Sequence, residues 1–149
     1  PQPVDLGEKA ERAAELLEPL LEEKRLHFVK NMAPSLPVRQ LDPDRVNQIL
    51  YNLITNAIRY THPGTAILLQ MEPVGKRVRL TIADEGPGIA QEDLDHIFEQ
   101  FYRGDKSRNR ASGGSGIGLS LAKSFVEAQG GTIIARNRKE GGAEFVVEL

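Results

Sequence analysis

Hydrophobic residues recur at helical spacing along residues 44–60, while polar residues gather on the other side of the same stretch. The apolar positions are Val46, Ile49, Leu50, Leu53, Ile54, Ala57 and Ile58. The polar positions are Asn52, Asn56, Arg59 and Tyr60, which share a face because residues four, seven and eight apart align on a helix. Asparagine is unfavourable inside a helix, since its amide competes for backbone hydrogen bonds. The pattern predicts a buried helix carrying a polar site, and a merely solvated face is the alternative.

Start and stop signals set the ends of this helix, and similar patterns predict its neighbours. Asp42 suits the N-cap and Pro43 the first helical position, whereas the sequence Thr-His-Pro-Gly at 61–64 ends the helix. Further helices are predicted over residues 6–23, over 91–98, and between the glycines at 118 and 130. The predicted strands cover residues 26–32, 38–41, 65–73, 77–84, 132–136 and 143–149. Residues 65–84 should form an antiparallel hairpin with one buried face, because apolar and polar residues alternate in its second strand.

Composition narrows the class of protein. The chain has 149 residues, 40% hydrophobic and 27% charged, which suits one soluble domain with a sizeable core. A net charge of −2 gives no indication of a nucleic-acid groove or a basic membrane surface. There is no cysteine for a disulfide or a thiolate zinc site, and no apolar run long enough to span a membrane. The opening residues, Pro-Gln-Pro-Val, have the character of a cut inside a longer chain.

Two glycine clusters are candidates for ligand contact. The first is Asp84-Glu-Gly86-Pro-Gly88-Ile89, at the end of a predicted strand. Its glycines would let the backbone approach a ligand, and its carboxylate could accept a hydrogen bond from an amine. A plain turn is the alternative. The second, Gly114-Ser-Gly-Ile-Gly118-Leu, precedes a helix, whose N-terminus attracts phosphate. Its spacing and context exclude the dinucleotide fingerprint and the P-loop.

An aromatic segment and a basic segment lie between the two glycine clusters. Phe98 and Phe101 are interpreted as core residues, next to Tyr102 and Arg103. Residues 104–114 hold three cations and no apolar residue larger than alanine, so they cannot bury enough surface to order themselves. We expect a flexible basic lid, because loops of this length inside a compact domain are usually functional.

Taken in order, these motifs resemble the N, first glycine, F and second glycine boxes of bacterial sensor histidine kinases. The resemblance is to their catalytic ATP-binding domain, a GHKL or Bergerat-fold relative of the gyrase and MutL ATPase domains. It covers nearly the whole chain, and residues 101–105 resemble osmosensor-type kinases. It implies a single domain over 1–149 with an α+β fold. That fold is a two-layer α/β sandwich, in which three main helices cover one face of a mixed, mostly antiparallel sheet.

The resemblance also implies a role for each motif residue, with ATP and Mg²⁺ as cofactors. Asn56 should bind Mg²⁺ through its amide oxygen, and Asn52 should lie near the metal and the γ-phosphate as a catalytic residue with Arg103. Asp84 should accept from the adenine amine. The remaining expected ATP-binding residues are Arg59, Tyr60, Gly86, Gly88, Ile89, Tyr102, Gly104, Gly114, Ser115, Gly116, Ile117, Gly118 and Leu119. Where gyrase-type relatives carry a glutamate that activates water, this chain has Asn52, so we expect transfer to an acceptor other than water.

The acceptor itself is not evident in this sequence. In the family it is a histidine followed by an acidic residue on a separate hairpin domain, and His27, His62 and His96 do not fit that pattern. We therefore expect these three to be structural or solvent-facing. The implied partners are the phosphoacceptor hairpin of the parent kinase and a response regulator. The implied setting is a monomeric cytoplasmic fragment of a membrane-anchored, homodimeric parent. A serine kinase of the anti-sigma type and a non-catalytic nucleotide-binding module are the alternatives.

Overall fold

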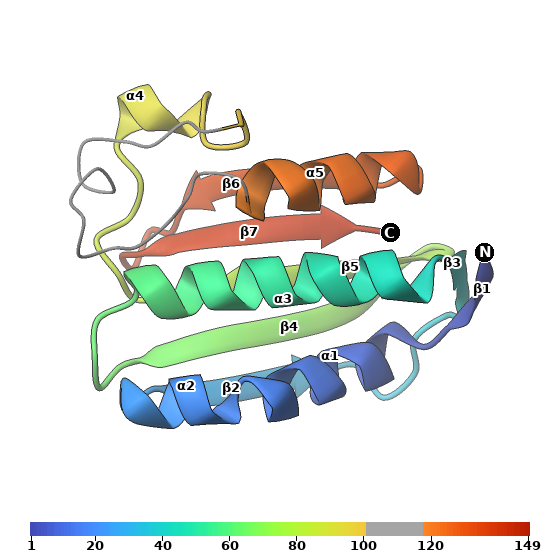
Figure 1. The fold of residues 1–149 in the computed structure, drawn as a ribbon, viewed down its shortest axis with the longest axis horizontal. Helices are drawn as coiled ribbons and strands as arrows, with labels where there is room; N and C mark the ends of the chain where they lie inside the picture. The colour runs from blue at the N-terminus through green and yellow to red at the C-terminus, as the bar shows by residue number, and fades with distance from the viewer. Residues whose placement is uncertain (101–117) are drawn as a thin grey trace.

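Five strands form a mixed sheet, and the long helices lie together on one of its faces (Figure 1). The computed structural model describes residues 1–100 and 118–149. The strands of this sheet are β2 (His27–Met32), β4 (Ala66–Val74), β5 (Arg77–Ala83), β6 (Thr132–Asn137) and β7 (Ala143–Glu148), and β1 (Gln2–Val4) pairs separately with β3 (Arg39–Leu41). The described helices are α1 (Leu6–Leu16), α2 (Glu18–Glu23), α3 (Pro43–Tyr60), α4 (Gln91–Leu94) and α5 (Gly118–Ala128).

The sheet has the strand order β2-β4-β5-β7-β6. β2 runs parallel to β4, and each of the other neighbouring pairs is antiparallel. Because side chains alternate along a strand, Ile67, Leu69 and Met71 of β4 are buried on the helix side. Helices α1, α3 and α5 cover that side (Figure 1). The predicted two-layer α+β sandwich with a mixed, mostly antiparallel sheet is confirmed.

Helix α3 forms the centre of the helical layer, between α1 and α5 (Figure 1). It begins as predicted, because Asp42 Oδ1 accepts from the backbone N–H of Asp44 at 3.0 Å and Pro43 opens the first turn. Its apolar face is fully buried, and Leu53 and Ile54 are 0% exposed. No helix within 1–100 or 118–149 is long and apolar enough to cross a membrane.

The prediction of a single helix over residues 6–23 is wrong. The chain forms α1 and α2 instead, with a break at Leu17. The reason is Pro19 in the first turn of α2, since proline has no N–H to donate and its ring clashes with the carbonyl four residues earlier. In these two helices, Leu16 is 71% and Leu20 43% exposed.

The helix predicted over residues 91–98 is also too long. Only Gln91–Leu94 is helical, and turns follow it. Its N-cap, Ala90, offers no side-chain hydrogen bond, and such a short helix has little stability of its own. Phe98 nevertheless reaches the core from this turn region, where its ring meets Phe145 edge-on with 6.1 Å between centroids.

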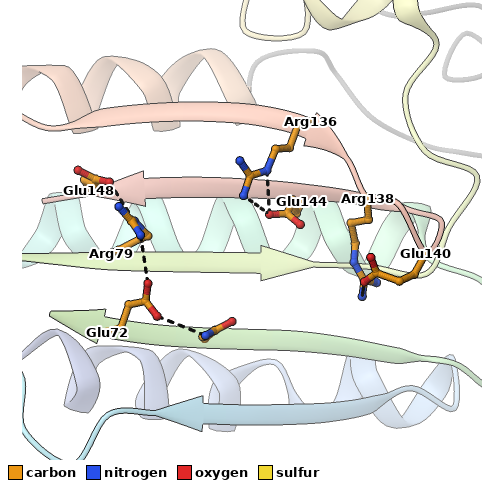
Figure 2. A network of polar contacts seen from close by, with 8 residues as sticks. Glu72, Arg79, Arg136, Arg138, Glu140, Glu144 and Glu148 are labelled. Carbon is orange, nitrogen blue, oxygen red and sulfur yellow. Dashed lines mark hydrogen bonds and ion pairs between the residues drawn. The ribbon is translucent and has the colours of Figure 1, made fainter. Parts of the chain in front are cut away.

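The face of the sheet opposite the helices carries compensated charges (Figure 2). Arg79 of β5 contacts Glu72 of β4 at 3.2 Å and Glu148 of β7 at 3.0 Å. Arg136 of β6 contacts Glu144 of β7 at 2.9 Å. Exposed ion pairs of this kind contribute little to stability, about 0–1 kcal/mol each. Their consequence is a solvated sheet face on which positive and negative groups are paired.

Candidate functional site

Three polar residues are buried in the described part of the chain, and they lie at one end of the molecule. Asn56 is 7%, Thr61 2% and Asp84 4% exposed. Thr61 follows α3 directly, and its Oγ accepts from the N–H of Glu85 at 3.1 Å, which joins the end of α3 to the end of β5. Buried polar groups cost free energy unless they have partners. The concentration of such groups at one place therefore marks a candidate site.

Asn56 and Asn52 lie on the polar side of α3, as predicted. Asn52 Nδ2 donates to the carbonyl oxygen of Gly118 at 3.2 Å, so it ties α3 to the first turn of α5. Asn56 differs, because its amide takes part in no hydrogen bond between described residues. A buried amide of this kind offers a neutral carbonyl oxygen as an acceptor or as a ligand for a hard cation.

Asp84 lies just past the end of β5 and is held from two sides. Its Oδ1 accepts from the N–H of Gly86 at 2.9 Å and from that of Ala143 at 3.2 Å. Its hydrogen bonds to described residues all go to this one oxygen. The second carboxylate oxygen therefore keeps its capacity to accept from a donor such as an amine, in an orientation set by the protein.

Both glycines of the first cluster are required by close contacts within the protein. A Cβ on Gly86 would lie 2.2 Å from the carbonyl oxygen of Tyr60, at the last turn of α3. Gly88 has a φ of +81°, and its Cβ would lie 2.8 Å from Asn137 Oδ1. These contacts are with Tyr60 and Asn137 of the protein itself, so the predicted approach of a ligand to these glycines stays a prediction.

Sequence reasoning missed the part of the site that comes from the turn between β6 and β7. Asn137 makes two hydrogen bonds with the backbone of Ile89, and Arg138 Nη1 donates to the carbonyl oxygen of Asp84 at 3.0 Å. Gly142 has a φ of +84°, and a Cβ there would lie 2.0 Å from that same carbonyl oxygen. The available signal was the pair of glycines in the turn, but only the pairing of β5 with β7 shows what they approach.

Arg59 and Tyr60 lie together at the C-terminal end of α3. The Arg59 guanidinium is exposed and 5.9 Å from the centre of the half-buried Tyr60 ring. Lys24, which was also missed, donates from Nζ to the carbonyl oxygens of Ile58 at 2.7 Å and Arg59 at 2.9 Å. Desolvation lowers the pKa of Lys24, while the nearby Asp84 charge acts in the opposite direction. This ammonium satisfies two of the carbonyls that a helix end leaves unpaired.

Several of the predicted ATP-binding residues lie outside the residues that the structure describes. These are Tyr102, Arg103, Gly104, Gly114, Ser115, Gly116 and Ile117. Gly118 and Leu119 are described, and they form the first residues of α5 rather than a loop before it. The three histidines, His27, His62 and His96, are all exposed, which agrees with the expected solvent-facing positions.

Together, the open mixed sheet, the asparagine-bearing helix and the carboxylate at the end of β5 define a two-layer α+β domain with a buried polar site. Residues 41–149 match the family model described as histidine kinase-, DNA gyrase B-, and HSP90-like ATPase. The chain belongs to this family.

Named relatives and solved structures agree with this assignment. The signal transduction histidine-protein kinase BaeS of Escherichia coli (strain K12) is 46% identical over 108 residues, which cover 72% of this chain and 23% of BaeS. Full-length ShkA, crystallised in complex with AMPPNP, superimposes with a TM-score of 0.84 at 33% identity over 98% of this chain and 30% of ShkA. The histidine kinase ThkA, in complex with the response regulator protein TrrA, gives a TM-score of 0.81 at 26% identity over 98% of this chain and 40% of ThkA. The chain thus spans about a quarter of the length of BaeS.

Proposed function

We propose that this chain is the ATP-binding catalytic domain of a two-component sensor histidine kinase. It binds Mg-ATP and donates the γ-phosphoryl group to a histidine on a separate phosphoacceptor domain. The observation that carries the proposal is Asp84, a buried carboxylate with one oxygen fixed by two backbone N–H groups, in a chain of this ATPase family. The AMPPNP complex of ShkA supports a nucleotide as the ligand.

The adenine end of the ligand is assigned to Asp84. Its second oxygen accepts from the 6-amino group, because the first is already satisfied by Gly86 and Ala143. Gly86, Gly88 and Ile89 form the backbone beside the base, and Tyr60 packs next to it. A protein site that hydrogen-bonds one substrate group rejects analogues lacking that group, since its own polar atom is then left unpaired. Asp84 therefore gives the site its preference for adenine.

The phosphate end is assigned to the polar face of α3 and the start of α5. Among the residues with described positions, no group of three or more His, Asp or Glu side chains could hold a metal ion. The buried Asn56 amide oxygen fits a magnesium ion that takes its other ligands from phosphate and water. Bound there, the metal would neutralise charge on the transferring group. Arg59 pairs with phosphate oxygens, and we keep the same role for Arg103 and the backbone of residues 114–119.

The reaction transfers phosphorus from oxygen to nitrogen. An imidazole nitrogen of the acceptor histidine bonds to the γ-phosphorus, the bond to the β,γ-bridging oxygen breaks, and ADP leaves while the imidazole gives up its proton. Asn52 cannot take a proton from water, because an amide is not a general base, so hydrolysis is not assisted at this position. An Asn52→Asp variant should therefore hydrolyse ATP faster. The measurement is the ratio of inorganic phosphate released to phosphorylated acceptor formed. Unchanged hydrolysis together with unchanged transfer would count against this role.

The partners follow from the same proposal. The acceptor is the helical hairpin domain of a parent kinase, and the phosphoryl group passes on to a response regulator, as the ThkA complex with TrrA suggests. We place the domain in the cytoplasm as a monomeric part of a membrane-anchored dimer, as its resemblance to sensor histidine kinases implies.

The decisive experiment is an Asp84→Asn variant, which keeps an oxygen for the two backbone donors but replaces the free oxygen with an NH₂ group. Isothermal titration with Mg-ATP should show at least about a tenfold loss of affinity, about 1.4 kcal/mol. Mg-ITP, whose base carries an acceptor in place of the amine, should bind the variant better than it binds wild type. Asp44→Asn, an exposed aspartate at the other end of α3, is the matched control. Wild-type protein that is folded but binds no Mg-ATP would refute the proposal.

A transfer assay separates the enzyme from its alternatives. Incubation with ATP and a separate histidine-containing hairpin domain should give an acid-labile phosphoramidate. An acid-stable phosphoserine on a protein substrate would indicate the serine kinase instead. Affinity for ATP without any phosphorylated acceptor in a single-turnover experiment would indicate a binding module.

A further inference from the structure

Asn137, the last residue of β6, makes a paired contact with a segment almost fifty positions earlier in the chain. Its Oδ1 accepts from the N–H of Ile89 at 2.7 Å, and its Nδ2 donates to the carbonyl oxygen of the same residue at 2.7 Å. Both backbone polar groups of Ile89 are therefore satisfied by one side chain. An amide matches this demand because it carries a donor and an acceptor side by side.

The contact acts on the turn that follows Asp84. Gly88, immediately before Ile89, adopts a φ of +81°, and Asn137 Oδ1 occupies the space that a Cβ on this glycine would need. The other end of the turn is held by Asp84, whose carbonyl oxygen accepts from Arg138 at 3.0 Å. Adjacent residues at the end of β6 thus hold the two ends of the turn.

Asp84 and Glu85 have other hydrogen bonds, to Ala143 and Thr61, but residues 87–89 would otherwise have few fixed points. Gly86, Pro87 and Gly88 lie outside helix and strand, and Ile89 is only half buried. A segment with two glycines gains many conformations when its hydrogen bonds are lost. The position of this turn relative to the Asp84 carboxylate therefore depends on the end of β6.

We propose that Asn137 is a positioning residue for adenine recognition. The inference rests on the proposed function, because it assigns Asn137 the task of holding the backbone of residues 86–89 where the base binds beside Asp84. Asn137 acts through Ile89 and has no role in the chemistry of phosphoryl transfer. Its loss should reduce discrimination between adenine and other bases more than it reduces the stability of the fold, since Asn137 itself is exposed.

Two substitutions separate the contributions of the two hydrogen bonds between Asn137 and Ile89. Asn137→Ala removes both hydrogen bonds. Asn137→Asp keeps the acceptor for the Ile89 N–H but sets a carboxylate oxygen against the Ile89 carbonyl, so it removes only the donor. Asn31→Ala is the matched control, because Asn31 is an exposed strand asparagine on β2 at the far side of the sheet.

The test measures binding and local opening together. Calorimetry with Mg-ATP and with Mg-ITP gives the affinity ratio, and NMR hydrogen exchange gives the protection of the Ile89 amide. We expect Asn137→Ala to weaken Mg-ATP binding about tenfold, to weaken Mg-ITP binding less, and to accelerate exchange at Ile89. Asn137→Asp should keep more of the Ile89 protection and still bind Mg-ATP more weakly than wild type. Asn31→Ala should change none of these quantities.

The outcomes separate this inference from the proposed function. Wild-type protein that binds no Mg-ATP would overturn both. Wild-type protein that binds Mg-ATP, together with Asn137 variants of equal affinity, would overturn the inference alone. An equal loss for Mg-ATP and Mg-ITP would also overturn it, because a general weakening of the fold does not distinguish the bases.

Discussion

Replacing Gly142 with alanine should displace Asp84, and the structure gives the size of the effect. The new Cβ would lie 2.0 Å from the carbonyl oxygen of Asp84 and 3.1 Å from its Oδ1. Since a Cβ essentially never comes within 3.0 Å of a heavy atom in a residue that is not its chain neighbour, the oxygen and the Cβ must separate by about 1 Å more. Neither group is a flexible side-chain end, so the backbone of β7 or the end of β5 must move.

A second glycine makes it possible to separate backbone strain from lost hydrogen bonds in the expected loss of stability. Gly64 has the same φ of +84° but nothing within 4 Å of its Cβ position. Gly64→Ala therefore reports the strain of a left-handed alanine alone, about 1–2 kcal/mol, reduced by about 0.4–1 kcal/mol because the unfolded chain also loses freedom. Gly142→Ala adds the disruption of the hydrogen bonds around Asp84, at about 1 kcal/mol for each neutral bond and up to about 3 kcal/mol for the bond from Arg138. We expect Gly142→Ala to cost about 2–4 kcal/mol more than Gly64→Ala if two of these bonds are lost, the larger value applying when the bond from Arg138 is one of them.

The assay is equilibrium unfolding in urea for both variants, followed by Mg-ATP titration under conditions where each is folded. Gly142→Ala should show the larger loss of stability and a lower affinity for Mg-ATP, whereas Gly64→Ala should bind as wild type does. Equal stability losses for the two variants would refute the argument from the 2.0 Å contact. Wild-type affinity in Gly142→Ala would refute the link between this glycine and the orientation of Asp84.

Three further predictions concern the surroundings of the site. Lys24→Met should lower the free energy of unfolding in urea by about 1–2 kcal/mol, because two carbonyl oxygens at the end of α3 lose their donor; an unchanged value would mean that water replaces the ammonium. Phe98→Leu should cost about 1 kcal/mol in the same assay through loss of the edge-on contact with Phe145, and Phe98→Tyr, which keeps the ring, should cost less. The hydrogen bond and charge of Glu99 raise the pKa of His96 above its ordinary 6.5, so the stabilisation by this pair is complete below about pH 6.5 and is lost as the pH rises through the folded-state pKa. NMR titration should show a lower pKa for His96 in Glu99→Gln, and an unchanged pKa would exclude Glu99 as the cause.

Elements with strong local signals could be predicted from the sequence. Helix α3 has a capping aspartate, a proline in its first turn and a complete apolar face, and each signal acts within a few residues. The end of α5 is similar, because Gly130 adopts a φ of +79° and the N–H of Gly131 bonds back to Val126. The errors at α1–α2 and at α4 have local causes too. Pro19 breaks a continuous apolar stripe, and Ala90 gives no cap to a helix that periodicity alone would extend.

The candidate site could be predicted only where its residues share one motif. Asn52, Asn56 and Asp84 stand out because an amide in a helix and an acid before two glycines are unusual in themselves. Asn137 and Gly142 do not stand out, because an asparagine and a glycine near a hairpin turn are ordinary turn residues. Their importance depends on which strand lies beside β7, and that is decided by the packing of the whole sheet.

The strand order explains why this hairpin supports the site. β5 pairs with β7 so that Ala83 lies opposite Glu144, and the residues after Ala83 must then leave the sheet beside the residues before Glu144. Asp84 is therefore placed against Gly142, and Asn137 of the neighbouring strand comes within reach of Ile89. A shift of one residue in the β6–β7 register would turn the Asn137 side chain to the opposite face of the sheet. The register of this hairpin thus determines the position of the turn after Asp84. An insertion between residues 138 and 141 that keeps the register should preserve Mg-ATP affinity. An insertion that shifts the register should lower both the Mg-ATP affinity and the hydrogen-exchange protection of the Ile89 amide.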